Sequence, residues 1–151
     1  MAAGEPSAMW SREQLIAEAR SIASRAYAPY SHFRVGAVVV VEREGGSSLV
    51  PGVNIENASL GLTLCAERSA LASARLSMMS GAEQVTQVAI ACLDALAEAP
   101  VSARAPCGAC RQWLAELAPQ AVVYLDGVEE SFRVADLLPH AFAFSLDEHS
   151  E

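Results

Sequence analysis

Three cysteines and one glutamate have the residue types and the spacing of a metal-dependent hydrolytic site. Cys65 stands two residues before Glu67. Further along, Cys107 and Cys110 have a Cys-x-x-Cys spacing. A catalytic zinc site holds three protein ligands and keeps a fourth position for water, whereas a structural zinc site closes with four protein ligands. The pattern therefore predicts a catalytic zinc site with three thiolate ligands and with Glu67 as the general acid and base.

Both cysteine segments are expected to begin helices. The positive end of a helix dipole favours a thiolate over a thiol, which would assist metal binding by Cys65 and Cys107. Residues three apart share a helix face, so the sulfurs of Cys107 and Cys110 should point the same way. Zinc is favoured over iron because thiolates are soft ligands and hydrolysis needs no redox change, although cysteine ligands alone would also accept iron.

Arg68 follows Cys65 by three residues and is expected to lie beside it on the same helix. Three thiolates leave a zinc ion with a net negative charge, which weakens its attraction for the electrons of a bound water. A guanidinium that donates hydrogen bonds to a ligand sulfur would withdraw part of that charge. The sequence therefore predicts a supporting role for Arg68.

Four segments resemble the free-nucleoside cytidine deaminase family, and the likeness runs from about residue 15 to residue 142. They are residues 29–37 (PYSHFRVGA), 54–58 (NIENA), 65–68 (CAER) and 106–112 (PCGACRQ). The resemblance implies one zinc per subunit, a homotetramer, and hydrolysis of cytidine and 2'-deoxycytidine to the uridines and ammonia in pyrimidine salvage. Glu67 would carry a proton from water to the pyrimidine ring while the water oxygen replaces the amino group at C4.

The same resemblance implies the substrate contacts. Asn54 and Glu56 would hydrogen-bond the ribose hydroxyls, and Phe33 would pack on the base. The backbone amide of Ala66 is a further candidate contact, with the base carbonyl, and Phe142 would reach the ligand of a neighbouring subunit. From the spacing alone, Asn54 and Glu56 are two polar side chains at a strand end that can face one pocket.

One position departs from the family pattern. Leu60 stands where relatives usually carry Tyr, at a place where subunit contacts near the site are expected. Cys92 lies among small apolar residues of a predicted strand and is interpreted as core. His32 and His149 do not have ligand spacing with the cysteines, and His140 follows Pro139 and is expected to be exposed, so none of the three receives a role.

The composition favours one domain that acts on a small molecule. A chain of 151 residues fits one domain, here with residues 1–11 as a loose leader and 145–151 as an acidic tail. A net charge of -8 argues against a nucleic-acid partner. Residues 35–41 form an apolar stretch far too short to cross a membrane. Four cysteines without a signal peptide suggest a reducing compartment, so a cytoplasmic location is expected.

Hydrophobic periodicity and turn residues predict the elements. Ser11 and Gln14 have capping-box spacing at the start of the first helix. Helices are expected at 12–27, 65–78 and 106–117, strands at 34–42, 48–54, 85–93 and 121–125, and a helical turn at 134–138. This order implies a three-layer α/β/α sandwich with a mixed sheet.

Other functions stay open at this stage. A deaminase for another aminopyrimidine would use the same chemistry. A polynucleotide deaminase is disfavoured because no basic groove is apparent. A non-catalytic zinc module would require a fourth protein ligand, and a redox dithiol at Cys107 and Cys110 would leave Cys65 and Glu67 without a role.

Overall fold

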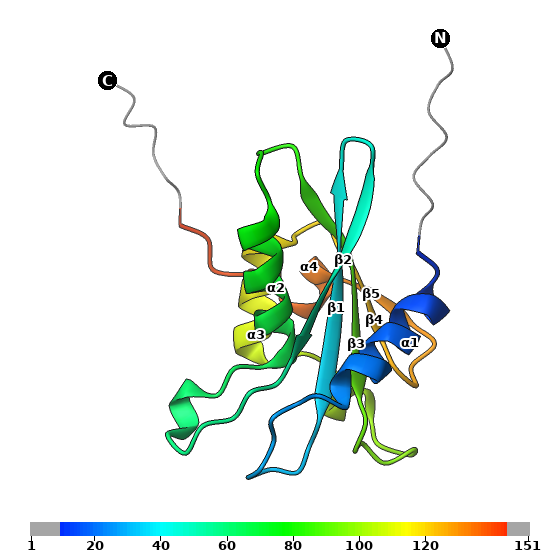
Figure 1. Ribbon diagram of the computed structural model, residues 1–151, viewed down its shortest axis with the longest axis vertical. Coiled ribbons are helices and arrows are strands. Elements are labelled where there is room, and N and C mark those ends of the chain that lie inside the picture. The colour runs from blue at the N-terminus through cyan, green and yellow to red at the C-terminus, as the bar shows by residue number, and fades with distance from the viewer. Residues whose placement is uncertain (1–9, 145–151) are drawn as a thin grey trace.

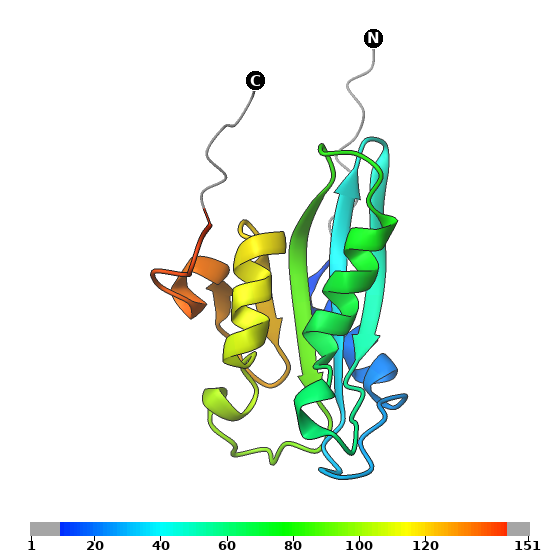
Figure 2. The same cartoon turned by 90° about the vertical axis from the view of Figure 1, so that its left-hand side faces the viewer.

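The computed structural model describes residues 10–144 and has three layers (Figure 1). Helix α1 (Arg12–Ala23) covers one face of a sheet, while α2 (Ala66–Ser77), α3 (Gly108–Leu117) and the short α4 (Val134–Leu137) lie on the other. Figure 2 shows α2 and α3 side by side against the sheet. The predicted three-layer sandwich with a mixed sheet is confirmed.

Five strands form the sheet in the order β2-β1-β3-β4-β5. Their bounds are β1 (Val35–Arg43), β2 (Gly46–Val53), β3 (Gln84–Cys92), β4 (Val122–Leu125) and β5 (Ser131–Arg133). The β3–β4 pair is parallel and the other pairs are antiparallel. Because β3 and β4 run the same way, the connections that follow them leave the sheet at one edge.

The valine run of β1 fits a strand that lies inside the sheet, between β2 and β3. Successive side chains of a strand point to opposite faces. Val39 and Val41 accordingly pack under α2 and α3, while Val38 and Val40 pack under α1. A strand buried on both faces reads as a continuous apolar run, which is the pattern found here.

A close approach between α2 and β2 fixes the position of the helix that carries Glu67. A Cβ atom on Gly52 would lie 2.5 Å from the carbonyl oxygen of Ala66 and 2.8 Å from the Cα atom of Ala70. No side chain larger than hydrogen fits between these two backbones. The first turn of α2 therefore rests directly on the end of the β hairpin.

Several predicted boundaries are corrected. The capping box of Ser11 and Gln14 is confirmed, but α1 ends at Ala23 instead of residue 27. The amide of Tyr27 donates to the carbonyl of Asn54, and the carbonyl of Tyr27 accepts from Glu56, so this segment extends beside the loop after β2. The third helix begins at Gly108, after Pro106.

Three short elements were not predicted. They are strand β5 and two 3-10 helices, Leu60–Leu62 and Val101–Ala103. Each is only three residues long, too short for periodicity to indicate. Most of the predicted leader, residues 1–9, and the predicted tail, residues 145–151, lie outside the described residues. No helix within residues 10–144 has the length and apolar character needed to cross a membrane.

Candidate zinc site

Three cysteine sulfurs converge where α2 and α3 begin. Cys65 and Cys107 are the N-cap residues of these helices, and Cys110 lies in the first turn of α3. The sulfur of Cys107 is 3.8 Å from that of Cys65 and 3.5 Å from that of Cys110. All three sulfurs lie within 4.8 Å of one another.

These separations fit a zinc ion. Zinc–sulfur bonds are about 2.3 Å long, and tetrahedral angles then place two ligand sulfurs about 3.8 Å apart. The backbone already holds the sulfurs near this spacing, and the positive ends of the dipoles of α2 and α3 favour the thiolate form of the cysteines. Among residues 10–144, no other group of three Cys, His, Asp or Glu side chains gathers in this way.

Hydrogen bonds within the cluster favour a thiolate at Cys65. The hydrogen bond from the Cys110 thiol, helped by Arg68 and Cys107, lowers the pKa of Cys65 to about 5 despite its partial burial. The same bond to Cys65 and burial raise the pKa of Cys110. Binding of a divalent cation would release the remaining thiol protons, as metal binding to thiols requires.

The structure places Arg68 beside this thiolate. Its Nη2 atom lies 3.5 Å from the sulfur of Cys65 and donates a 3.2 Å hydrogen bond to the carbonyl of Thr63. The carbonyl contact orients the guanidinium, and the sulfur contact brings positive charge to one metal ligand.

Glu67 occupies the first turn of α2 and is only 5% exposed. Burial is the main cause that raises the pKa of its carboxyl to about 7, and the nearby Cys65 thiolate adds to the shift. An ordinary glutamate, with a pKa of about 4.3, would stay ionised at neutral pH. Glu67 can both accept and release a proton there, as a general acid and base must.

A cavity of about 190 Å³ connects these groups. Two ligand cysteines, Cys65 and Cys107, form part of its wall. The wall also includes Phe33, Asn54, Ala66, Glu67, Cys92 and Arg104. Cys92 is buried, as expected for a core residue, and burial raises the pKa of its thiol to about 11, so it faces the cavity as a neutral group.

Asn54 holds the chain that carries Phe33. Its Oδ1 atom accepts a 2.8 Å hydrogen bond from the amide of Val35, and its Nδ2 atom donates a 2.8 Å bond to the carbonyl of Phe33. One lone pair of Oδ1 and one N–H of Nδ2 stay available for another partner. The structure thus brings Asn54 and Phe33 together in the cavity wall.

Glu56 fixes the neighbouring loop and does not belong to the residues that line the cavity. Its Oε2 atom accepts from the amides of Tyr30, at 2.9 Å, and Ser31, at 3.2 Å, and its other oxygen bonds the Ser31 hydroxyl. The Ser31 hydrogen bond is the first cause of a lowered pKa at Glu56.

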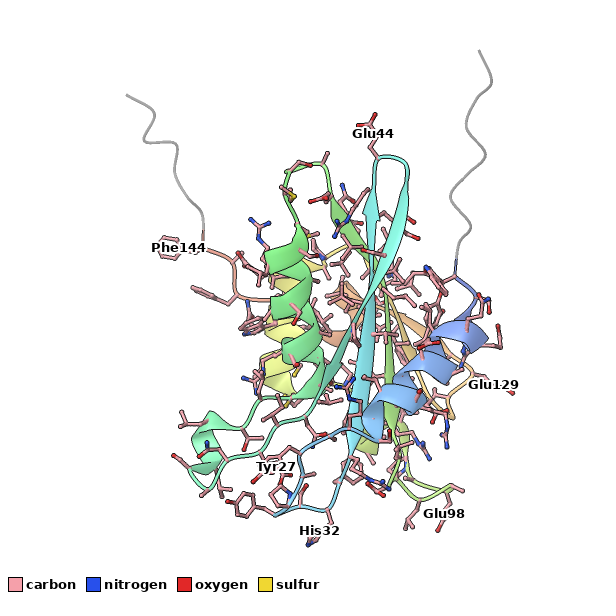
Figure 3. All side chains as sticks on the ribbon, in the orientation of Figure 1. Tyr27, His32, Glu44, Glu98, Glu129 and Phe144 are labelled. Atoms are coloured by element: carbon pink, nitrogen blue, oxygen red, sulfur yellow. The ribbon has the colours of Figure 1, made fainter. Side chains whose placement is uncertain are left out.

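Two predicted positions lie away from the cavity of their own chain. Phe142 is 71% exposed, and its carbonyl accepts a 2.8 Å hydrogen bond from Gln112. Leu60 is 73% exposed in a 3-10 helix. His32 points outward at the end of its loop (Figure 3), neither it nor His140 joins the metal cluster, and His149 lies outside the described residues.

Arg104 is a charged residue of the cavity wall to which the sequence analysis assigned no role. It lies between the strand predicted at 85–93 and the helix predicted at 106–117, and its side chain is buried and donates hydrogen bonds to backbone carbonyls. An isolated arginine among small residues carries no periodic signal, so only the folded chain reveals it.

Together, the sandwich fold and this site define a zinc-dependent hydrolase. Residues 9–126 match the family model described as the cytidine and deoxycytidylate deaminase zinc-binding region. A cytidine deaminase of Halalkalibacterium halodurans is 43% identical over 135 residues, which cover 87% of this chain and 93% of that protein. A cytidine deaminase of Mycobacterium tuberculosis is 38% identical over 128 residues, or 85% of this chain and 86% of that protein.

A solved structure agrees with the sequence comparisons. The crystal structure of cytidine deaminase from Burkholderia pseudomallei superposes with a TM-score of 0.74 at 39% identity, covering 88% of this chain and 100% of that chain. The chain therefore belongs to the cytidine and deoxycytidylate deaminase family, and the cluster of Cys65, Cys107 and Cys110 fits the zinc site of that family.

Proposed function

We propose that this protein hydrolyses cytidine and 2'-deoxycytidine to uridine and 2'-deoxyuridine with release of ammonia, in pyrimidine salvage. The observation that carries the proposal is the pairing of two features in one cavity: a cluster of three thiolate ligands and a buried carboxyl whose pKa is about 7. The named relatives, which are cytidine deaminases, support the choice of substrate.

The cysteines and Arg68 hold and tune the metal. When bound, zinc supplies a Lewis acid that lowers the pKa of a water towards about 7. The sulfurs of Cys65, Cys107 and Cys110 would hold the ion. The Arg68 guanidinium, 3.5 Å from the sulfur of Cys65, draws negative charge from that ligand.

Glu67 moves the protons of the reaction. A carboxylate oxygen of Glu67 accepts a proton from the attacking water and returns it to the ring nitrogen next to C4. The water oxygen forms a bond to C4. Glu67 then takes the remaining proton of that oxygen to the amino nitrogen, the bond from C4 to this nitrogen breaks, ammonia leaves, and the oxygen stays on C4 as the uridine carbonyl. A pKa of about 7 suits both directions of transfer at neutral pH.

Residues of the cavity wall, and Glu56 of the neighbouring loop, orient the nucleoside. Ala66 is the first residue of α2, so its amide has no acceptor within the helix and can donate to the base carbonyl. Phe33 would pack on the base. Asn54 keeps one donor and one acceptor free for a ribose hydroxyl. Glu56 would bind a second hydroxyl through lone pairs that its loop contacts leave unused.

The protein is proposed to act as a cytoplasmic homotetramer. Support comes from Phe142, which is exposed and lies outside the cavity of its own chain, as a residue donated to a neighbouring subunit would. Leu60 and Leu62 form a further exposed apolar pair at the 3-10 helix, where Leu60 takes the place of the Tyr usual in the family. Sedimentation velocity on the zinc-loaded protein measures the assembly directly, and a monomer would refute it.

The deciding experiment follows ultraviolet absorbance after addition of cytidine to the purified protein, beside a Glu67→Gln variant, with the zinc content of both measured. The proposal expects turnover by the parent and none by the zinc-loaded variant. Equal turnover by the variant would refute the role of Glu67. No turnover by a zinc-loaded, assembled parent would refute cytidine as the substrate, and base-modified cytidines would then be compared.

A further inference from the structure

One buried cation beside the cavity has no part in the mechanism above. Arg104 is 8% exposed and lines the same cavity as Glu67 and Cys107. Within residues 10–144, no carboxylate lies at ion-pair distance from it. Burying an unpaired charge is costly unless hydrogen bonds compensate for the lost water. The partners of the guanidinium therefore indicate what the residue does.

The guanidinium bonds three backbone carbonyls from two separate connections. Its Nη2 atom donates to the carbonyls of Leu96, at 2.6 Å, and Ala97, at 3.4 Å, in the loop after β3. Its Nη1 atom donates to the carbonyl of Asp126, at 3.1 Å, in the turn after β4. Because β3 and β4 are parallel neighbours, Arg104 joins the two connections at the sheet edge where the cavity lies.

The turn after β4 is shaped around this side chain. Gly127 adopts a φ of +77°, and a Cβ atom placed on it would lie 3.1 Å from Nη1 and 3.3 Å from Cζ of Arg104. Glycine therefore serves two requirements here, a left-handed backbone and the space for a planar guanidinium.

A short, well-bonded path leads from Arg104 to the metal ligand Cys107. The amides of Arg104 and Ala105 both donate to the carbonyl of Val101, at 2.9 Å each, and close a tight turn. Pro106 follows with a restricted φ angle. Its carbonyl accepts a 2.8 Å hydrogen bond from Arg111 of α3.

We propose that Arg104 is a positioning residue that places Cys107 for zinc. The hydrogen bonds of its planar guanidinium to Leu96 and Asp126 hold one end of the 104–107 segment at the sheet edge. The hydrogen bond from Arg111 to Pro106 holds the other end against α3. Without the first anchor, the loop after β3 and the segment before Cys107 lose their common attachment. The sulfur of Cys107 would then no longer be held near the tetrahedral spacing. The inference rests on the zinc site and not on the identity of the substrate.

The test compares Arg104→Met, Arg104→Lys and a matched control, Arg133→Met. The control makes the same chemical change at an exposed arginine whose partner, Asp136, is also on the surface. Zinc affinity is measured by competition with a chelator. Cobalt(II) is then loaded in place of zinc, and the sulfur-to-cobalt charge-transfer absorption reports the thiolate geometry. Steady-state kcat and KM are recorded where the parent shows turnover.

Loss of an outer support of a metal ligand typically lowers metal affinity 10–100-fold. We expect at least a tenfold weaker zinc affinity and an altered cobalt spectrum for Arg104→Met. A fall in kcat larger than the rise in KM should accompany them. Arg104→Lys, which keeps the charge but not the planar guanidinium, should show a smaller loss of zinc affinity. Arg133→Met should match the parent.

A folded Arg104→Met protein with the zinc affinity and cobalt spectrum of the parent would overturn the inference, even if its melting temperature fell. If Arg104→Met does not fold, Arg104→Lys decides by the same two measurements. Because metal binding is read without substrate, a parent that fails to deaminate cytidine would refute the proposed function and leave this test intact.

Discussion

Substitution of Gly52 by Ala is expected to damage both stability and the site. The added Cβ would lie 2.5 Å from the carbonyl oxygen of Ala66 and 2.8 Å from the Cα atom of Ala70, where atoms of this kind need about 3.5 Å. Both neighbours are backbone, so α2 must move away from β2 by about 1 Å. Overpacking of this kind costs about 3 kcal/mol, the upper part of the usual range, because no flexible side chain can yield.

The displacement would reach the chemistry because Ala66 lies between Cys65 and Glu67. Urea unfolding of the zinc-loaded protein, at one fixed protein concentration, measures the loss of stability, and kcat measures the damage to the site. Gly81→Ala is the matched control, since a Cβ atom there meets nothing within 4 Å. It should change the free energy of unfolding by less than about 1 kcal/mol. A Gly52→Ala protein that also stays within that limit and keeps its kcat would refute the close-approach argument.

Two further results are expected. Arg68→Ala should retain most of its zinc but lose kcat by about 10–100-fold, because the guanidinium beside Cys65 is removed while the three sulfurs remain. Metal analysis and steady-state kinetics check this prediction. An unchanged kcat with the metal intact would reject the role of Arg68. Asp94→Asn should remove a pH-dependent part of the stability. The hydrogen bond from Arg34 is the main cause that lowers the pKa of Asp94 to about 2, so this stabilisation is present above the unfolded pKa of about 3.9 and is lost as the pH falls to about 2. The difference in urea midpoint between parent and variant should therefore be constant from pH 7 to about 5 and vanish towards pH 2, and a difference unchanged at pH 2 would contradict the assignment.

The sequence indicated the groups whose arrangement is local. Cys107 and Cys110 are neighbours on any helix, and the valine run of β1 predicts a buried strand without knowledge of its partners. The end of α1 required long-range information, because the segment after Ala23 unwinds to bond the loop after β2. Strand β5 exists only because β4 supplies a partner for three residues.

The same distinction applies within the site. The closeness of Cys65 to the other two sulfurs follows from the packing of α2 beside α3, so its prediction rested on the combination of residue types and on the family resemblance, and not on local spacing. Arg104 was missed because its acceptors lie in segments that fold against it from elsewhere in the chain. For Glu56, the resemblance predicts a contact with the ribose. The structure also shows hydrogen bonds from Glu56 to the loop at Tyr30 and Ser31, which its residue type alone did not reveal.

The proposed metal cluster and the proposed proton carrier, Glu67, need opposite environments, and the start of α2 provides both. Thiolates are favoured by the helix N-terminus and by Arg68, and those same positive influences would keep a carboxyl ionised. The pKa of Glu67 nevertheless rises to about 7, since burial outweighs the pull of Arg68. Two residues along a helix correspond to a rotation of about 200°. Cys65 is the partly buried N-cap residue, where hydrogen bonds from Cys110 and Arg68 lower its pKa to about 5, while Glu67 is buried in the first turn of the helix. A shift of either residue by one position would turn its side chain by about 100°, away from its present environment, which is why the Cys-x-Glu spacing matters to the chemistry.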